Sequence, residues 1–295
     1  MSDDIPSPPH WFSYSDQWMS APPDASTIPC INVFALCFLL TKGAWDNAQQ
    51  WTTFTDAQRQ QIKTAYNNAG IKLIVSAFGD TDIPTTNKVD PVKCAQTFAD
   101  WVKQYDLDGI DVDYEDLGAF QNGTAEKWLI DFTTELRNNL PKGQYIVTHA
   151  PLAPWFMDNK TAYPGGGYLY IDQQIGDMID WYNVQFYNQG DDVYQDCNNL
   201  LFESTPLKFP KTSVFEINAA GVPLSKIVIG KPATKQDATT GYMDPTVLAG
   251  CLETAKGKGW DAGVMTWQYP RGDSAWFKTV RAQSWPCECE EEPEE

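Results

Sequence analysis

The segment from Asp108 to Glu115 carries four carboxylates in eight residues and reads Asp-Gly-Ile-Asp-Val-Asp-Tyr-Glu. Apolar residues alternate with the acids as in a β-strand, so Asp111, Asp113 and Glu115 are expected to share one face. Close carboxylates in an enclosed site cannot all ionise, and at least one pKa must rise well above its ordinary value. A carboxyl group that keeps its proton near neutral pH can act as the general acid of glycoside hydrolysis.

The elements that must hold this segment alternate between strand and helix along the chain. We predict strands over 11–14, 31–40, 72–78, 109–115, 145–150, 181–187, 226–232 and 263–269, and helices over 55–69, 91–105, 125–139, 245–258 and 273–283. Alternation of this kind implies parallel strands joined by right-handed crossovers. Eight such units in about 280 residues favour an α/β fold, a single (β/α)8 TIM barrel, over a doubly wound sheet.

This architecture predicts where the acids lie. On the fourth strand they point into the barrel, with Glu115 at the carboxyl end, where active sites of such barrels are found. The first unit has no clear helix, and the stretch 151–176, rich in Pro, Gly and Tyr, is predicted to be a long loop over that face. We expect the catalytic barrel to span 1–286, and 287–295 to form an acidic, disordered tail.

The charge of the chain restricts its partners. The 295 residues include 21 Lys and Arg against 39 Asp and Glu, which argues against nucleic acid or an anionic membrane and favours a neutral or cationic substrate. No apolar run reaches the roughly 18 residues of a membrane span. The N-terminus lacks the basic start and apolar stretch of a signal peptide, so the sequence predicts a soluble chain.

The seven cysteines are odd in number and show no metal-site spacing. For the first five (Cys30, Cys37, Cys94, Cys197 and Cys251) we favour burial as small apolar side chains over disulfides by roughly two to one. Cys287 and Cys289 could chelate a metal weakly. We predict no bound metal and no cofactor.

The acidic strand resembles the catalytic strand of glycoside hydrolase family 18, the chitinases and endo-β-N-acetylglucosaminidases, whose pattern is DxxDxDxE. All four acids match it. Other segments resemble the family in strand order: Ser76-Ala77-Phe78-Gly79, where Phe78 replaces the first glycine of SxGG; Gln185-Phe186-Tyr187-Asn188, similar to plant-type members; and Trp267 at the end of the eighth strand.

The resemblance implies a retaining mechanism without an enzyme nucleophile, in which the N-acetyl group of the substrate attacks the anomeric carbon. By this likeness Glu115 is the acid and base, Asp113 orients the acetamide, and Asp111 exchanges a proton with Asp113. Tyr187 holds the acetamide oxygen and Trp267 floors the sugar pocket.

Further residues are predicted to contact sugar or to serve the fold. The likeness to plant-type members adds Gln185 and Asn188 to the substrate-binding residues, and Trp155 in the expected loop is a further candidate. Tyr187 and Trp267 could instead be core aromatics, although their places at strand ends favour the site. His149 is interpreted as a hydrogen-bonded structural residue.

The predicted function is endo-acting hydrolysis of β-1,4 bonds between N-acetylglucosamine units, as in chitin. The Asp-Tyr-Glu form of the catalytic strand favours this over an endo-β-N-acetylglucosaminidase acting on the chitobiose core of N-glycans. A carbohydrate-binding barrel without turnover and a divalent-metal site are further alternatives. Strands seven and eight are joined only by 233–262, without a large α+β insertion, so we expect an open cleft.

The sequence also bears on the binding partner, the oligomeric state and the localisation of the protein. The partner should be a polysaccharide or glycan containing N-acetylglucosamine, bound by a monomer. The substrate class favours a secreted enzyme, although localisation is left open.

Overall fold

Eight parallel strands close into a barrel in this computed structural model, which describes residues 5–205 and 208–287. The barrel strands are β1 (His10–Ser15), β2 (Val33–Leu40), β4 (Lys72–Gly79), β5 (Gly109–Tyr114), β6 (Ile146–His149), β7 (Tyr182–Gln185), β8 (Ile227–Pro232) and β9 (Gly263–Trp267). The short β3 (Gly43–Ala44) pairs antiparallel with β2. The predicted (β/α)8 fold and its eight strands are confirmed.

The first and last strands meet to close the barrel. β1 pairs parallel with β2 on one side and with β9 on the other. Because β5 lies between β4 and β6, its inward side chains meet those of the other strands across a shared interior.

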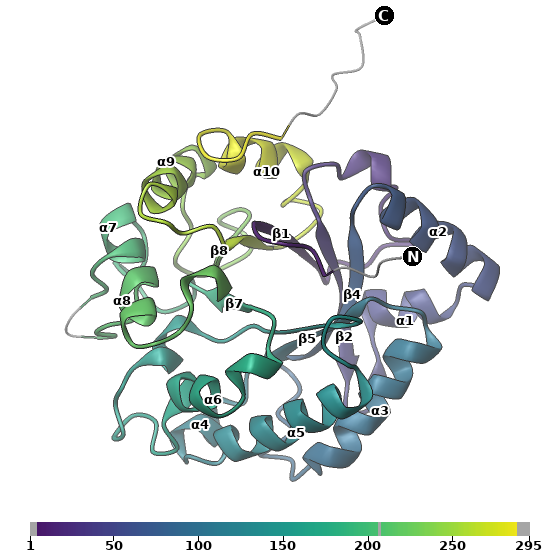
Figure 1. The fold of residues 1–295 in the computed structure, drawn as a ribbon, viewed down its shortest axis with the longest axis horizontal. Coiled ribbons are helices and arrows are strands. Elements are labelled where there is room, and N and C mark those ends of the chain that lie inside the picture. Colours follow the sequence, from purple (N-terminus) through teal and green to yellow (C-terminus); the bar gives the residue numbers. More distant parts are fainter. Residues whose placement is uncertain (1–4, 206–207, 288–295) are drawn as a thin grey trace, which may run out of the picture.

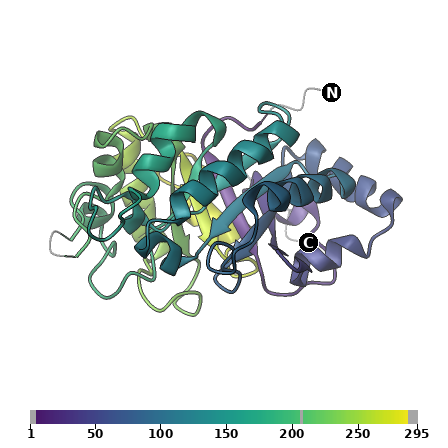
Figure 2. The ribbon, with the colours of Figure 1, turned by 90° about the horizontal axis from the view of Figure 1, so that it is seen from below.

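Helices form an outer layer around the strands, as Figures 1 and 2 show. The five predicted helices are present as α2 (Asp56–Asn68), α3 (Pro91–Gln104), α5 (Ala125–Asn139), α9 (Pro245–Lys256) and α10 (Ser274–Arg281). The sequence interpretation missed α1 (Asp46–Thr52), α4 (Leu117–Gln121), α6 (Gly167–Ile175), α7 (Cys197–Leu201) and α8 (Val214–Ala219). In the described part of the chain, no helix has the length and hydropathy needed to cross a membrane.

The stretch 151–176 is not the long loop that we expected. Its second part is α6, which packs beside α5 in the helical layer (Figure 1). The run of three glycines before it suggested a loop, but Gly166 and Gly167 adopt positive φ angles of 104° and 61° as the helix begins. Gly167 also approaches the carbonyl of Trp155 so closely that a Cβ atom would lie 2.3 Å from its oxygen. Gly166 and Gly167 therefore allow the tight turn with which α6 begins.

Two disulfides correct the expectation that the cysteines would be buried thiols. Cys30 is bonded to Cys287 and Cys197 to Cys251, whereas Cys37 and Cys94 are buried and free as predicted. The expected weak chelation by Cys287 and Cys289 is excluded for Cys287 by its disulfide. Residues 288–295 of the expected acidic tail, including Cys289, lie outside the described residues. Disulfides are typical of proteins from oxidising compartments.

The Cys30–Cys287 bond spans 257 residues, so it restricts the unfolded chain over nearly its whole length. We expect the double substitution Cys30→Ser with Cys287→Ser to lower the free energy of unfolding by about 2–4 kcal/mol, measured by urea denaturation. Dithiothreitol should lower the thermal midpoint of the wild type, and should have no further effect once all four bonded cysteines are serine. An unchanged wild-type midpoint after complete reduction would contradict this assignment.

Candidate active site

Asp111 is the innermost of the three acids, and four strands supply its hydrogen-bond donors. Tyr14 Oη and Ser76 Oγ donate to Oδ2 over 2.8 and 2.9 Å, from β1 and β4. Thr148 Oγ1 and Asn183 Nδ2 donate to Oδ1 over 2.6 and 3.1 Å, from β6 and β7. A fully buried carboxyl group is thereby satisfied by neutral donors alone.

Asp113 and Glu115 continue the row toward the carboxyl end of β5. Gln185 Nε2, at the end of β7, lies 3.0 Å from Asp113 Oδ1 and 3.2 Å from Glu115 Oε1, and the two carboxyl groups hydrogen-bond each other. Gln185 also donates to the carbonyl of Ala150 over 3.0 Å, which fixes its amide. The predicted residues Glu115, Asp113 and Gln185 are thus one contiguous group.

Burial and mutual repulsion change the acidity of this group. Burial, with the charges of Glu115 and Asp111, raises the pKa of Asp113 well above its ordinary value. Burial also raises the pKa of Glu115, opposed by the hydrogen bond from Gln185. The pair therefore holds one proton at a pH where ordinary carboxyl groups are ionised.

A cleft of about 400 Å³ opens beside Glu115. Asp113, Gln185, Tyr187, Asn188 and Trp267 all line it, so the structure brings together every predicted site residue except Asp111, which lies beneath, and Trp155. Burial raises the pKa of Tyr187 well above its ordinary value, so its phenol stays neutral and can donate a hydrogen bond. The cleft thus has both aromatic and polar side chains around its acids.

Trp267 and Phe38 are aromatic residues that line this cleft. The ring of Trp267 stacks on that of Phe38, with centroids 6.0 Å apart, and lies 5.8 Å from that of Tyr14. Phe38 was not predicted, because it sits in an apolar strand without a motif. A flat apolar surface of this kind suits the C–H face of a pyranose ring.

Asp16 and Asp80 also line the cleft, and sequence reasoning missed both. They follow β1 and β4 directly, so the only available signal was an acid after a strand end. Burial, with the charges of Asp46 and Asp80, raises the pKa of Asp16 to about 6. Among the residues that line this cleft in the described chain, none is Lys or Arg, which fits the expectation of a neutral or cationic substrate.

Phe78 shows how the departure from SxGG is accommodated. Its φ angle is 75°, a left-handed conformation that glycine adopts easily. The ring is buried among Phe98, Phe132 and Trp128, with centroid distances of 5.3, 5.4 and 5.7 Å. This aromatic packing offsets the backbone strain at a site where the family pattern has glycine.

Trp155 does not line the cleft, which corrects its prediction as a sugar contact. It is 2% exposed and stacks on Phe120 with centroids 4.1 Å apart. A tryptophan in an expected loop proved to be core because that stretch folds against α5 and α6. His149 is fully buried between Thr133 Oγ1, at 3.0 Å, and Tyr168 Oη, at 3.1 Å, as its structural interpretation implied.

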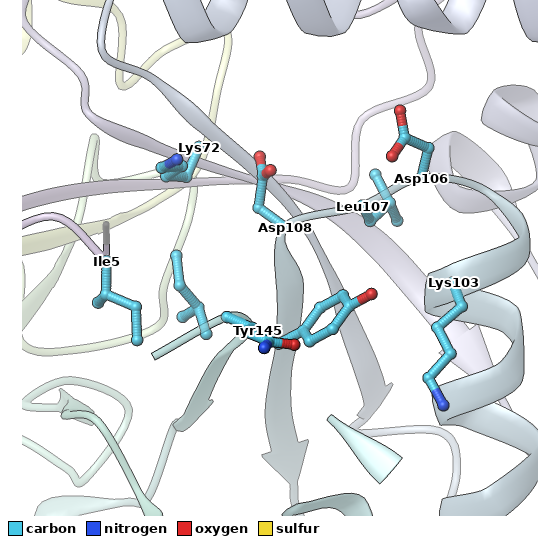
Figure 3. A pocket seen from close by; sticks show the side chains of 9 residues that line it. Ile5, Lys72, Lys103, Asp106, Leu107, Asp108 and Tyr145 are labelled. Carbon is cyan, nitrogen blue, oxygen red and sulfur yellow. The ribbon is translucent and has the colours of Figure 1, made fainter. Parts of the chain in front are cut away.

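Asp108, the first acid of the motif, lies at the opposite end of the barrel. It borders a separate cavity of about 170 Å³ at the start of β5, with Lys72, Asp106 and Tyr145 around it (Figure 3). Its carboxylate accepts the backbone N–H of Leu73 over 2.7 Å and pairs with Lys63. Asp108 therefore joins β5 to β4 and α2 and cannot reach the cleft.

Comparison with known proteins agrees with this arrangement. The family profile described as glycosyl hydrolases family 18 matches residues 11–282. The chain belongs to glycosyl hydrolase family 18. Endochitinase 4 of Metarhizium anisopliae is 26% identical over 240 residues, which cover 72% of this chain and 78% of that protein.

Solved structures place the family-18 chain among similar barrels. A GH18 chitinase from Pseudoalteromonas aurantia is 28% identical, with a TM-score of 0.74 over 92% of this chain and 99% of that one. The xylanase and alpha-amylase inhibitor protein XAIP-II from Scadoxus multiflorus shares the fold at 17% identity and a TM-score of 0.58, over 92% and 98% of the two chains. Family and relatives identify this family-18 barrel as a chitinase-type glycoside hydrolase.

The raised pKa of Asp16 makes a pH-dependent contribution to stability. Its pKa is higher in the folded than in the unfolded chain, so its ionisation disfavours the folded state above about pH 6. We expect Asp16→Asn to raise the thermal midpoint at pH 8 and to leave it nearly unchanged at pH 4. Asp100→Asn, at an exposed position of α3, is the control for the loss of one charge. An equal shift of Asp16→Asn at both pH values would show that ionisation of Asp16 is not the cause.

Proposed function

We propose that this protein is an endo-acting chitinase that hydrolyses β-1,4 bonds between N-acetylglucosamine units with retention of configuration. The observation that carries the proposal is the position of Glu115. It shares one proton with Asp113, whose pKa is raised well above its ordinary value, and it opens onto a cleft that the ring of Trp267 lines. A carboxyl group so placed can give its proton to a glycosidic oxygen and later take one from water.

In the proposed first step the carboxyl proton of Glu115 passes to the glycosidic oxygen as its bond to the anomeric carbon breaks. The acetamide oxygen of the same sugar attacks that carbon and forms an oxazolinium ion. Water then adds to the anomeric carbon and loses a proton to the Glu115 carboxylate, which restores the acid. Two displacements at one carbon account for retention.

Asp113 and Asp111 stabilise the positive charge that develops on the acetamide nitrogen. In the free enzyme Asp113 shares one proton with Glu115. We propose that when the cleft fills Asp113 leaves this proton on Glu115 and turns, as a carboxylate, to the substrate nitrogen. Asp111, held by four neutral donors, lies beneath Asp113 and can exchange a proton with it. The neutral Tyr187 phenol donates to the acetamide oxygen, while Gln185 and Asn188 contact the sugar from the neighbouring strand end.

Endo action is proposed from the shape of the barrel. The connection from β8 to β9 spans 233–262 and contains α9 alone as regular structure among its residues. Without a wall on that side, a chain can lie across the cleft and be cut internally.

Two other functions remain to be distinguished by experiment. An N-glycan core offers the same N-acetylglucosamine linkage, and the catalytic row would serve it equally. An inert binding barrel is the second, since a similar fold occurs in a protein named as an inhibitor. The presence of Glu115 favours turnover.

The first test offers the wild type chitohexaose and a high-mannose glycoprotein together and identifies the products by mass spectrometry. We expect short chitooligosaccharides. Glu115→Gln should lower their rate of formation by at least about a hundredfold, because the amide cannot supply the proton. Released glycans ending in one N-acetylglucosamine would instead favour the glycan-cleaving function, and binding without any product would favour the inert barrel.

The role of the acetamide gives a second prediction. A fully deacetylated glucosamine hexamer has no carbonyl oxygen to attack the anomeric carbon, so we expect its hydrolysis to be undetectable under conditions that degrade chitohexaose completely. Calorimetric titration with both hexamers checks that the deacetylated one still binds. Comparable cleavage of the two would rule out substrate assistance.

A further inference from the structure

Lys231 of β8 is a fully buried lysine that the proposed chemistry does not use. Its Nζ donates to the carbonyl oxygens of Phe186 and Gly241 over 2.9 and 3.1 Å, and to that of Tyr194. The three acceptors come from the end of β7, from the loop that follows it, and from the loop after β8. One side chain therefore joins three backbone segments.

Burying this amine is costly. Burial lowers the pKa of Lys231 to about 7, and an apolar side chain in its place would avoid that desolvation. The three acceptors match the three N–H bonds of an ammonium group. Packing alone does not explain a buried lysine here, so its role is expected to lie in its three hydrogen bonds to the backbone.

The three segments surround the backbone of Tyr187. Phe186 precedes it directly, and Gly241 packs so tightly that a Cβ atom there would lie 2.5 Å from Tyr187 Cα. The next residue, Asn188, donates its N–H to Thr240 over 3.0 Å, and Gly190 N–H donates to Thr240 Oγ1 over 3.0 Å. The segment 186–190, which includes residues that line the cleft, is thus hydrogen-bonded to the loop 239–241, and Lys231 donates to both.

We propose that Lys231 is a positioning residue for the reaction: it fixes the segment 186–190 on the loop 239–241, so that the Tyr187 hydroxyl stays where the acetamide oxygen binds. This role rests on the proposed function. Lys231 does not line the cleft, so it acts through Tyr187 and touches no substrate. Displacing such a donor by about 1 Å is enough to cost on the order of a hundredfold in rate.

The test compares Lys231 with Lys226, which also donates to backbone carbonyls but lies at the opposite end of β8. Lys226 Nζ donates to Gly176 and Ile179 carbonyls over 2.7 and 2.9 Å, before β8 begins. We expect Lys231→Met to lower kcat and kcat/KM for chitohexaose equally, by about tenfold to a hundredfold. Lys226→Met should lower the thermal midpoint and leave kcat unchanged.

A double-mutant cycle with Tyr187→Phe separates positioning from a general loss of stability. If Lys231 acts through the Tyr187 hydroxyl, Lys231→Met should cost little further activity in the Tyr187→Phe background. Multiplied losses would overturn the proposal, as would a Lys231→Met enzyme with wild-type kcat. If Lys231→Met fails to fold, Lys231→Gln, which keeps two N–H donors, undergoes the same cycle with a smaller expected loss.

Hydrogen–deuterium exchange provides a readout that needs no turnover. Lys231→Met should speed exchange in the peptide spanning 186–190, and Lys226→Met should not. Unchanged exchange there would overturn the positioning role even if the wild type cut no chitohexaose. Faster exchange without wild-type activity would keep the positioning of 186–190 by Lys231 and reject only the proposed function.

Discussion

The structure depends on the burial of a row of carboxyl groups whose hydrogen-bond donors, in the described part of the chain, carry no positive charge. An isolated buried carboxylate is costly, and opposite charges are its usual compensation. Among the described residues, the hydrogen bonds to Asp111, Asp113 and Glu115 come from hydroxyl, amide and carboxyl groups. Neutral donors satisfy the oxygens without pulling the pKa values down as a lysine or arginine would, so protons remain in the site.

The closed barrel supplies those donors because its strands are in register. Ser76 and Thr148 are the partners of Asp111 on the two neighbouring strands, which brings a hydroxyl to either side of its carboxyl group. Tyr14 and Asn183 reach it from β1 and β7, and β1 is held in the ring by its pairing with β2 and β9. The closed barrel therefore brings together the neutral donors that surround Asp111.

The sequence was sufficient where a local pattern determines the outcome. Strand periodicity predicted the barrel, and the spacing of the acids predicted that they would point into it, with Glu115 at the carboxyl end of the fourth strand. It was insufficient where tertiary contacts decide. The cysteines that bond lie 54 and 257 residues apart, Asp16 gains its raised pKa from residues on other elements, and Trp155 is buried by a helix that its glycine-rich surroundings concealed. Lys231 had no motif, since its three acceptors are backbone carbonyls.

Depth along β5 gives three similar acids different surroundings. Asp111 is 0% exposed and fully hydrogen-bonded, Asp113 is 5% exposed, and Glu115, just past the strand, is partly exposed in the cleft. Glu115, which we propose meets the substrate, has one methylene more than the two aspartates, so it can reach outward while Gln185 still donates to it. In the proposed mechanism Asp111 and Asp113 exchange a proton behind Glu115, and the hydrogen bond between Asp113 and Glu115 couples their pKa values. A strand with alternate acids in a closed barrel therefore places one carboxyl group in the cleft and two more at increasing depth behind it.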